Sequence, residues 1–309
     1  MFAAPYRRAP RRHAVVRRAI SLAAVLACSL ALAQPAATPG AAVADAAPTL
    51  VLPDGGKYYG SLKDGLLDGT GRLVWNAQRH YEGQFVQGRL QGQGKLTVAH
   101  GVYEGQFADG DLNGPGRYTG TDGQRYEGAF VDGEYDGEGV LTDAGGDRYQ
   151  GRFTKGQFTG TGRMTDGSGT VVLGEFSNFV PSGVMEVQYT GGIVFVGEMQ
   201  GSRPKGPGEL RLPGGMRIRG DYSAGYLETG EVDYPNGDRY RGALMGNMAH
   251  GKGVLTYADG SVYTGQFAMG KPHGRGSLAP ANVAKAARAG AGGKATVQMA
   301  VQTAAQTGQ

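Results

Sequence analysis

The chain has 309 residues, of which 57 are glycine and one is cysteine. Glycine makes up about 7 % of an average protein, so this excess calls for a structural explanation. The formal net charge is +4, but residues 1–33 hold six arginines and no lysine, aspartate or glutamate, so residues 34–309 carry −2 once those six charges are subtracted. This balance gives no overall basis for binding nucleic acid, and a single cysteine excludes a disulfide framework or a cysteine metal site.

The first 33 residues have the layout of a secretory signal peptide. Six arginines precede a largely apolar stretch, Ala19–Leu32, which ends in the small-residue motif Ala31-Leu32-Ala33. This stretch is shorter than the roughly 20 residues that a membrane-spanning helix needs. We therefore expect export and cleavage before Gln34; lipidation at Cys28, a twin-arginine signal at Arg17-Arg18 and retention as an anchor stay open. Residues 34–49, rich in alanine and proline, are expected to be a linker.

Residues 50–280 repeat with a period of 22 or 23 residues. In the unit Tyr81–Val102, Tyr81, Gly83 and Phe85 alternate with polar residues, which is typical of a strand with one buried face. Glycine-rich turn residues follow, and Lys95–Val98 alternates again as a return strand. The pattern therefore predicts an all-β array of about ten hairpins, lying side by side in one antiparallel sheet. Units one to ten are centred on Gly60, Gly83, Gly105, Gly128, Gly151, Gly174, Gly197, Gly220, Gly242 and Gly265.

Three columns of apolar or aromatic residues recur at fixed positions of the unit and predict the buried face. The first column is Tyr58, Tyr81, Tyr103, Tyr126, Tyr149, Val172, Phe195, Ile218, Tyr240 and Tyr263; the second is Leu62, Phe85, Phe107, Phe130, Phe153, Phe176, Met199, Tyr222, Leu244 and Phe267; the third is Leu73, Leu96, Tyr118, Leu141, Met164, Val187, Leu210, Val232, Leu255 and Leu278. The signature glycine lies between the first two columns, where its missing side chain lets neighbouring aromatic rings pack over the backbone. The opposite face alternates glutamate with arginine or lysine.

The pattern Tyr-Glu-Gly-x-Phe, followed by Gly-x-x-x-Gly-x-Gly, resembles the MORN repeat (membrane occupation and recognition nexus), here of an exported bacterial type. The resemblance covers about residues 50–280 and implies an elongated, twisted, solenoid-like single-layer sheet. It also implies protein–protein association or self-association, and in this family a link to phospholipid surfaces. Five units carry the signature most clearly: Tyr81, Gly83, Phe85; Tyr103, Gly105, Phe107; Tyr126, Gly128, Phe130; Tyr149, Gly151, Phe153; and Tyr263, Gly265, Phe267.

Units six to eight depart from the pattern. Other residues stand where turn glycines are expected: Phe179 and Met185 in unit six, Ser202 in unit seven, and Thr229 and Glu231 in unit eight. A non-glycine residue in the left-handed region costs roughly 1–2 kcal/mol, so we expect these turns to adopt other shapes. The array should then change twist or bend between about Gly174 and Gly230. Residues 281–309 have no aromatic residue and are expected to be a disordered tail.

The sequence contains no Gly-x-Ser-x-Gly elbow, phosphate-binding loop or His-Glu-x-x-His motif. We therefore expect a non-enzymatic binding or scaffolding protein, periplasmic or associated with the cell envelope, without cofactor, metal or nucleic-acid partner. Its partner is expected to be a protein or a second copy. Binding of phospholipid or envelope glycan, and an accessory role for a separately encoded enzyme, stay open. Four residues are candidates for contact with a partner: Trp75 and Tyr118 on the aromatic face, and Phe179 and Arg203 at the altered turns.

Overall fold

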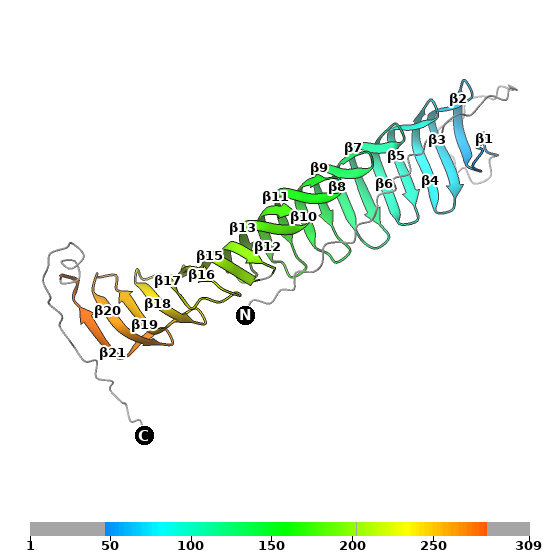
Figure 1. The fold of residues 1–309 in the computed structure, drawn as a ribbon. Helices are drawn as coiled ribbons and strands as arrows, with labels where there is room; N and C mark the ends of the chain where they lie inside the picture. The colour runs from blue at the N-terminus through cyan, green and yellow to red at the C-terminus, as the bar shows by residue number, and fades with distance from the viewer. Residues whose placement is uncertain (1–46, 202, 283–309) are drawn as a thin grey trace. The chain divides into compact units, whose positions relative to one another are not determined.

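The computed structural model describes residues 47–201 and 203–282, which form 21 strands of one open antiparallel sheet (Figure 1). The predicted all-β fold of hairpin repeats is therefore confirmed. Two compact units divide the described chain: the first runs to Gly167 and includes Ser177–Phe179, and the second comprises Ser168–Phe176 and the residues from Val180 onward. The predicted signal peptide and nearly all of the predicted linker and tail lie outside the described residues.

The first unit contains eleven strands: β1 (Leu50–Val51), β2 (Lys57–Lys63), β3 (Leu66–Asn76), β4 (Arg79–Val86), β5 (Arg89–Val98), β6 (Gly101–Ala108), β7 (Asp111–Gly120), β8 (Arg125–Val131), β9 (Glu134–Thr142), β10 (Arg148–Thr154) and β11 (Gln157–Thr165). The remaining ten are β12 (Val171–Ser177), β13 (Val180–Gln188), β14 (Val194–Gln200), β15 (Arg203–Arg211), β16 (Arg217–Tyr222), β17 (Thr229–Asp233), β18 (Arg239–Met245), β19 (Met248–Thr256), β20 (Val262–Ala268) and β21 (Lys271–Ala279).

A row of glycines crosses the sheet and marks its register. Gly83 of β4 pairs with Gly94 of β5, which pairs with Gly105 of β6. Beside this row the first column pairs with the third, as Tyr81 does with Leu96. A shift of the strand pairing by one residue would turn both columns to the solvent-exposed face, so the apolar pattern determines the register.

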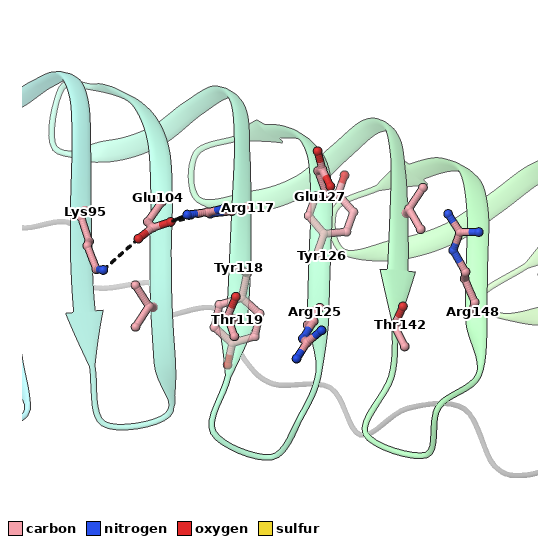
Figure 2. Close-up of a pocket in the computed structure, with 12 residues that line it drawn as sticks. Lys95, Glu104, Arg117, Tyr118, Thr119, Arg125, Tyr126, Glu127, Thr142 and Arg148 are labelled. Atoms are coloured by element: carbon pink, nitrogen blue, oxygen red, sulfur yellow. Dashed lines mark hydrogen bonds and ion pairs between the residues drawn. The ribbon is translucent and has the colours of Figure 1, made fainter. Parts of the chain in front are cut away.

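Each hairpin curls over toward its tip, and this curvature buries the apolar face of a single-layer sheet (Figures 1 and 2). The ring of Phe85 meets Tyr81 of its own unit edge-on at 5.2 Å and Tyr58 of the preceding unit at 5.1 Å. All ten first-column side chains are buried. The prediction of thirty buried positions is wrong at Leu62 and Leu278, which are 38 % and 39 % exposed because they belong to the first and last hairpins and lack a neighbour on one side, and Leu96 and Met199 are only half-buried.

A fourth column, missed in the sequence, fills the curl. Its members stand two residues after the hairpin turn and pair with the second column, as Leu90 does with Phe85. The fourth column could therefore have been found in the sequence by asking which residue of the return strand pairs with each second-column phenylalanine. The buried members are Leu67, Leu90, Leu112, Tyr135, Phe158, Pro204, Leu227 and Ala249.

The aromatic rings do pack over the glycine row, as predicted. A Cβ atom added to Gly94 would lie 2.1 Å from the hydroxyl oxygen of Tyr81, which donates a hydrogen bond to the carbonyl of Gln84 at 3.2 Å. In unit three the same space is taken by Leu112, whose Cδ1 would lie 3.2 Å from a Cβ on Gly105. The space over each glycine pair is thus filled by one side chain, but its source differs between units.

The turn of unit six keeps its left-handed shape, so the prediction of another shape is wrong for Phe179. Asn178 and Phe179 have φ angles of 51° and 66°, close to the 48° and 74° of Lys155 and Gly156 in unit five. The amide of Phe179 donates to the carbonyl of Phe158 at 3.1 Å, as the amides of Gly110, Gly133 and Gly156 do to carbonyls of their preceding units. Burial of the Phe179 ring, 8 % exposed, offsets the backbone strain of about 1–2 kcal/mol.

Three other departures, Met185, Thr229 and Glu231, lie in strands and not in turns; Thr229 begins β17 and pairs with Ala243. Met185 lies within β13 and pairs with Gly197, in the glycine row. In unit eight the one-residue deletion brings Gly230 into that row, where it pairs with Gly220 and Gly242, so Glu231 does not replace a glycine there. Ser202 lies outside the described residues, and the bend between Gly174 and Gly230 stays a prediction.

Candidate functional site

A polar groove of about 700 Å³ lies on the outer face of strands β5 to β10, within the first compact unit (Figure 2). Side chains alternate along a strand, so the residues on either side of the buried columns point to this face. The backbone and side chains that line the groove belong to Lys95, Val102, Glu104, Arg117, Tyr118, Thr119, Arg125, Tyr126, Glu127, Val140, Thr142 and Arg148.

At the β5 end of the groove, opposite charges neutralise one another. Glu104 on β6 accepts from Lys95 on β5, with Nζ and Oε1 2.9 Å apart, and from Arg117 on β7 (Figure 2). The hydrogen bond from Lys95, followed by the one from Arg117, lowers the pKa of the Glu104 carboxyl below its ordinary value. The predicted alternation of charges on the outer face is thus confirmed, and three of the groove's six charged side chains form one closed network.

At the other end, two arginines face solvent without a carboxylate. Arg125 on β8 and Arg148 on β10 both pair with Thr142 on β9, so the three residues form one row across adjacent strands. Strands lie about 4.8 Å apart, which places the two arginine backbones about 10 Å apart with the threonine between them. No ion pair within residues 47–201 and 203–282 engages either guanidinium. The arrangement can bind an anionic group between two guanidiniums.

The four residues predicted to contact a partner differ in burial and in their contacts. Tyr118 and Phe179 are buried, 2 % and 8 % exposed, because the hairpins curl over the aromatic face, so neither ring offers a surface. Trp75 is half-buried: its Nε1 donates to Asp54 Oδ2 at 3.2 Å, and Arg79 covers its ring at 4.4 Å. Arg203 is exposed at the start of β15.

Sequence reasoning missed the residues that form the open end of the groove. Arg125 and Arg148 each precede a first-column tyrosine and therefore point outward, which was readable in the sequence. The absence of an ion-pair partner for these two arginines could not be predicted from the sequence, because it depends on which residues the neighbouring strands place beside them.

Among the described residues, no group of three or more His, Cys, Asp or Glu side chains is arranged to hold a metal ion. In the same part of the chain, no helix has the length and apolar character needed to cross a membrane.

Comparison with known proteins identifies the repeats. The MORN repeat model matches seven segments, at residues 58–77, 81–97, 103–125, 126–148, 149–171, 240–262 and 263–279. The chain therefore contains seven MORN repeats, and the segment between residues 171 and 240, where the signature departs from the pattern, is not matched. A comparison with curated protein sequences finds no match.

Solved structures with some similarity are TCP domains of CPAP proteins. The TCP domain of SAS-4 (dCPAP) from Drosophila melanogaster, in complex with a proline-rich motif of Ana2 (dSTIL), is 15 % identical, covers 55 % of this chain and 85 % of its own, and has a TM-score of 0.32. The TCP10 domain of Danio rerio CPAP, in complex with a STIL peptide, is 18 % identical, covers 76 % and 93 %, and has a TM-score of 0.30. Similarity this low indicates nothing about the partners of this chain.

Proposed function

We propose that this protein is a non-enzymatic scaffold of the cell envelope whose groove on β5–β10 binds an acidic segment of a partner protein. Seven MORN repeats suggest a binding or scaffolding role. The observation that supports this ligand is the pair of unpartnered guanidiniums, Arg125 and Arg148, on either side of Thr142. Four basic side chains line the groove against two acidic ones, and one of the acids is already engaged.

An extended acidic segment fits this spacing. Alternate residues of an extended chain lie on the same side, about 6.6–6.8 Å apart, and two long arginine side chains can converge on carboxylates at that distance. Bonds between guanidinium and carboxylate are roughly twice as strong as neutral hydrogen bonds. Exposed ion pairs contribute only about 0.2–1 kcal/mol each and weaken with salt, so the binding is expected to be modest and sensitive to ionic strength.

A defined peptide tests the groove. The probe is a fluorescent ten-residue peptide with aspartate at alternate positions, and its matched control has asparagine there. Anisotropy with the full chain should show that R125A/R148A binds the aspartate peptide at least tenfold more weakly than the unaltered chain. The control variant R163A, which changes an exposed outer-face arginine on β11 that does not line the groove, should stay within twofold.

Three outcomes would overturn this assignment. They are equal binding of the two peptides, an unchanged affinity in R125A/R148A, or loss of anionic-vesicle binding in that variant without loss of peptide binding. Glycan binding through stacked aromatic rings is less favoured, because Arg79 already covers the ring of Trp75. A partner that proves to be an enzyme would make this scaffold its accessory.

The envelope location is supported by the sequence of residues 1–33. N-terminal sequencing of the protein from an envelope fraction should begin at Gln34. Finding the intact chain, beginning at Met1, in the cytoplasm would reject export and leave the groove assignment untouched.

A further inference from the structure

The last strand, β21, has one edge that no described strand covers. Figure 1 shows β21 as the last strand of the array; it pairs with β20, and no hairpin follows it within residues 47–201 and 203–282. An uncovered edge presents backbone amides and carbonyls that can pair with another chain. At β2 the chain covers the edge itself: Tyr58 and Lys57 pair with β1, and the amide of Thr49 donates to the carbonyl of Tyr58 at 2.8 Å.

Earlier hairpins bind the next hairpin through the edge that β21 leaves uncovered. In seven of them the carbonyl of the fourth-column residue accepts a hydrogen bond of 2.8–3.1 Å from a turn amide of the following hairpin. Pro272 has the fourth-column place in β21, since it pairs with Phe267, and no following hairpin among the described residues offers it an amide. Proline suits this role because only its carbonyl is used, as at Pro204, which accepts from Gly225 at 3.0 Å.

The side chains of β21 are exposed where those of an earlier return strand are covered. Pro272 is exposed and Leu278 is 39 % exposed, whereas Ala249 and Leu255, at the same places of β19, are buried. The difference arises because β19 has β20 beside it. The edge of β21 therefore keeps both the hydrogen-bonding groups and the apolar positions that an interior hairpin uses to bind its neighbour.

The pairs within the array define the strand that fits this edge. In several hairpins the next strand places an aromatic residue opposite the third-column residue, a glycine opposite the row glycine, and a second aromatic residue opposite a left-handed glycine. β21 repeats these positions at Leu278, Gly276 and Gly274, and the φ of Gly274, 68°, is close to the 63° of Gly251. The complementary strand therefore has the pattern aromatic-x-Gly-x-aromatic, antiparallel to β21.

This chain does not supply such a strand. It contains no Phe, Tyr or Trp after Phe267. The earlier strands with this signature, from β4 to β20, lie between two neighbours, and β2 is covered by β1. A second copy therefore has no uncovered signature strand to add, which favours a strand from a different protein.

The charges on β21 specify one further position of that strand. Lys271 and Arg275 are exposed, and neither β20 nor β21 contains aspartate or glutamate. Asp259, in the turn before β20, already accepts from Ser261. Arg275 lies between Gly274 and Gly276, so it faces the residue between the glycine and the second aromatic residue of an incoming strand. An acidic residue there would pair with Arg275 across the ladder.

We propose that the uncovered edge of β21 binds an extended segment of a partner protein with the pattern aromatic-x-Gly-acid-aromatic, which continues the sheet as an eleventh outgoing strand. Strand addition to a sheet edge takes affinity from backbone hydrogen bonds and specificity from alternate side chains. The edge belongs to the second compact unit and shares no residue with the groove on β5–β10, so either site can fail alone.

Two peptides probe the edge. One is a fluorescent twelve-residue peptide with Tyr-Thr-Gly-Glu-Phe at its centre, and its control has the same composition in the order Tyr-Phe-Gly-Glu-Thr, which turns the two rings to opposite faces. Anisotropy with the full chain should show at least tenfold tighter binding of the first peptide. The groove variant R125A/R148A should bind it within twofold of the unaltered chain, which separates this edge from the groove.

Lysine substitutions test the edge itself. P272K/L278K should weaken binding of the first peptide at least tenfold, because lysine on an edge strand opposes pairing. The peptide is acidic, so a merely electrostatic attraction would instead grow stronger in this variant. The matched control is V86K/V131K, which replaces two valines, 48 % and 49 % exposed, in the first compact unit; it should change binding less than twofold. Thermal unfolding of each variant checks the fold.

Hydrogen exchange of the unaltered chain locates the peptide without any substitution. The β21 amides that do not bond to β20 should exchange at least tenfold faster than those of β19, and the peptide should slow them while leaving β5–β10 unchanged. Equal binding of the two peptides, or unchanged affinity in P272K/L278K, would refute the proposal. So would slow exchange of every β21 amide in the free monomer, which would mean that the chain covers its own edge, or protection that rises with protein concentration as a dimer forms.

Discussion

Replacing Gly94 by alanine tests whether the tyrosine ring and the glycine row form one packing element. A Cβ at this position would lie 2.1 Å from the hydroxyl oxygen of Tyr81 and 2.5 Å from two of its ring carbons. Tyr81 is fully buried and meets Phe85 and Phe107 edge-on at 5.2 Å and 5.1 Å. Gly94 does not have a positive φ, so alanine adds no backbone strain and the cost is steric.

The ring of Tyr81 must move to admit the methyl group, and the loss can be estimated from its contacts. Two edge-on aromatic pairs contribute about 0.5–1.5 kcal/mol each beyond their buried area. The hydrogen bond to Gln84 contributes about 0.5–1.5 kcal/mol. Since the ring can keep part of these contacts, we expect G94A to lower the free energy of unfolding by about 2–4 kcal/mol.

Urea unfolding followed by circular dichroism measures this change, and hydrogen exchange of the β4–β6 amides locates it, because a repeat array can open locally. The control is G167A: Gly167 also lacks a positive φ, and a Cβ there has nothing within 4 Å. It should change stability by less than about 0.5 kcal/mol. A G94A variant as stable as G167A would refute the reasoning.

In unit six, a larger side chain at the position of Gly94 occurs together with a smaller side chain at the position of Tyr81. Val172 stands at the tyrosine position and Met185 at the position of Gly94, with its Sδ 2.7 Å from where a Cβ on Gly174 would lie. Transplanting this pair as Y81V/G94M should therefore be less destabilising than the sum of Y81V and G94M, because the valine leaves room for the methionine. Strict additivity would show that ring and glycine do not share the space.

Three further predictions follow from the geometry, and a fourth, the bend, from the sequence. Because Phe179 has a φ of 66°, F179G should be more stable than F179A by roughly 1 kcal/mol in urea unfolding; equal stabilities would show that the turn relaxes without strain. Burial raises the pKa of Tyr81 to about 12, so the stability it contributes is full below its unfolded value near 10 and falls as the pH rises from 10 toward 12; absorbance at 295 nm should therefore show this ionisation together with unfolding, and titration of all tyrosines near pH 10 in a folded chain would contradict this. The pKa of Glu104 is lowered, so E104Q should cost up to about 1 kcal/mol above pH 4.5, with the difference from the unaltered chain vanishing as the pH falls below the folded pKa; a difference that persists at pH 2 would point to packing instead. Small-angle scattering should detect a bend between Gly174 and Gly230, and a curve that fits one straight, uniform rod would count against it.

The sequence alone determined the architecture because the repeat is local and in phase. Tyr81, Gly83 and Phe85 alternate over five residues, and the same alternation recurs in most units, so strand, turn and buried face follow from spacing. The charged outer face followed in the same way: Lys95, Glu104 and Arg117 were readable as a ladder, and the structure pairs them.

Tertiary structure decided which surfaces are open. The curl of the hairpins buries Tyr118 and Phe179, which the sequence offered as candidates for contact with a partner, because a strand pattern shows which side a residue faces but not whether the sheet folds over that side. The isolation of Arg125 and Arg148 beside Thr142 depends on pairing between strands, and Phe179 keeps a glycine-like turn because its ring gains more from burial than its backbone loses. Each of these features depends on how side chains from adjacent strands share space and charge. The sequence of one strand does not show which residues the adjacent strands bring to it.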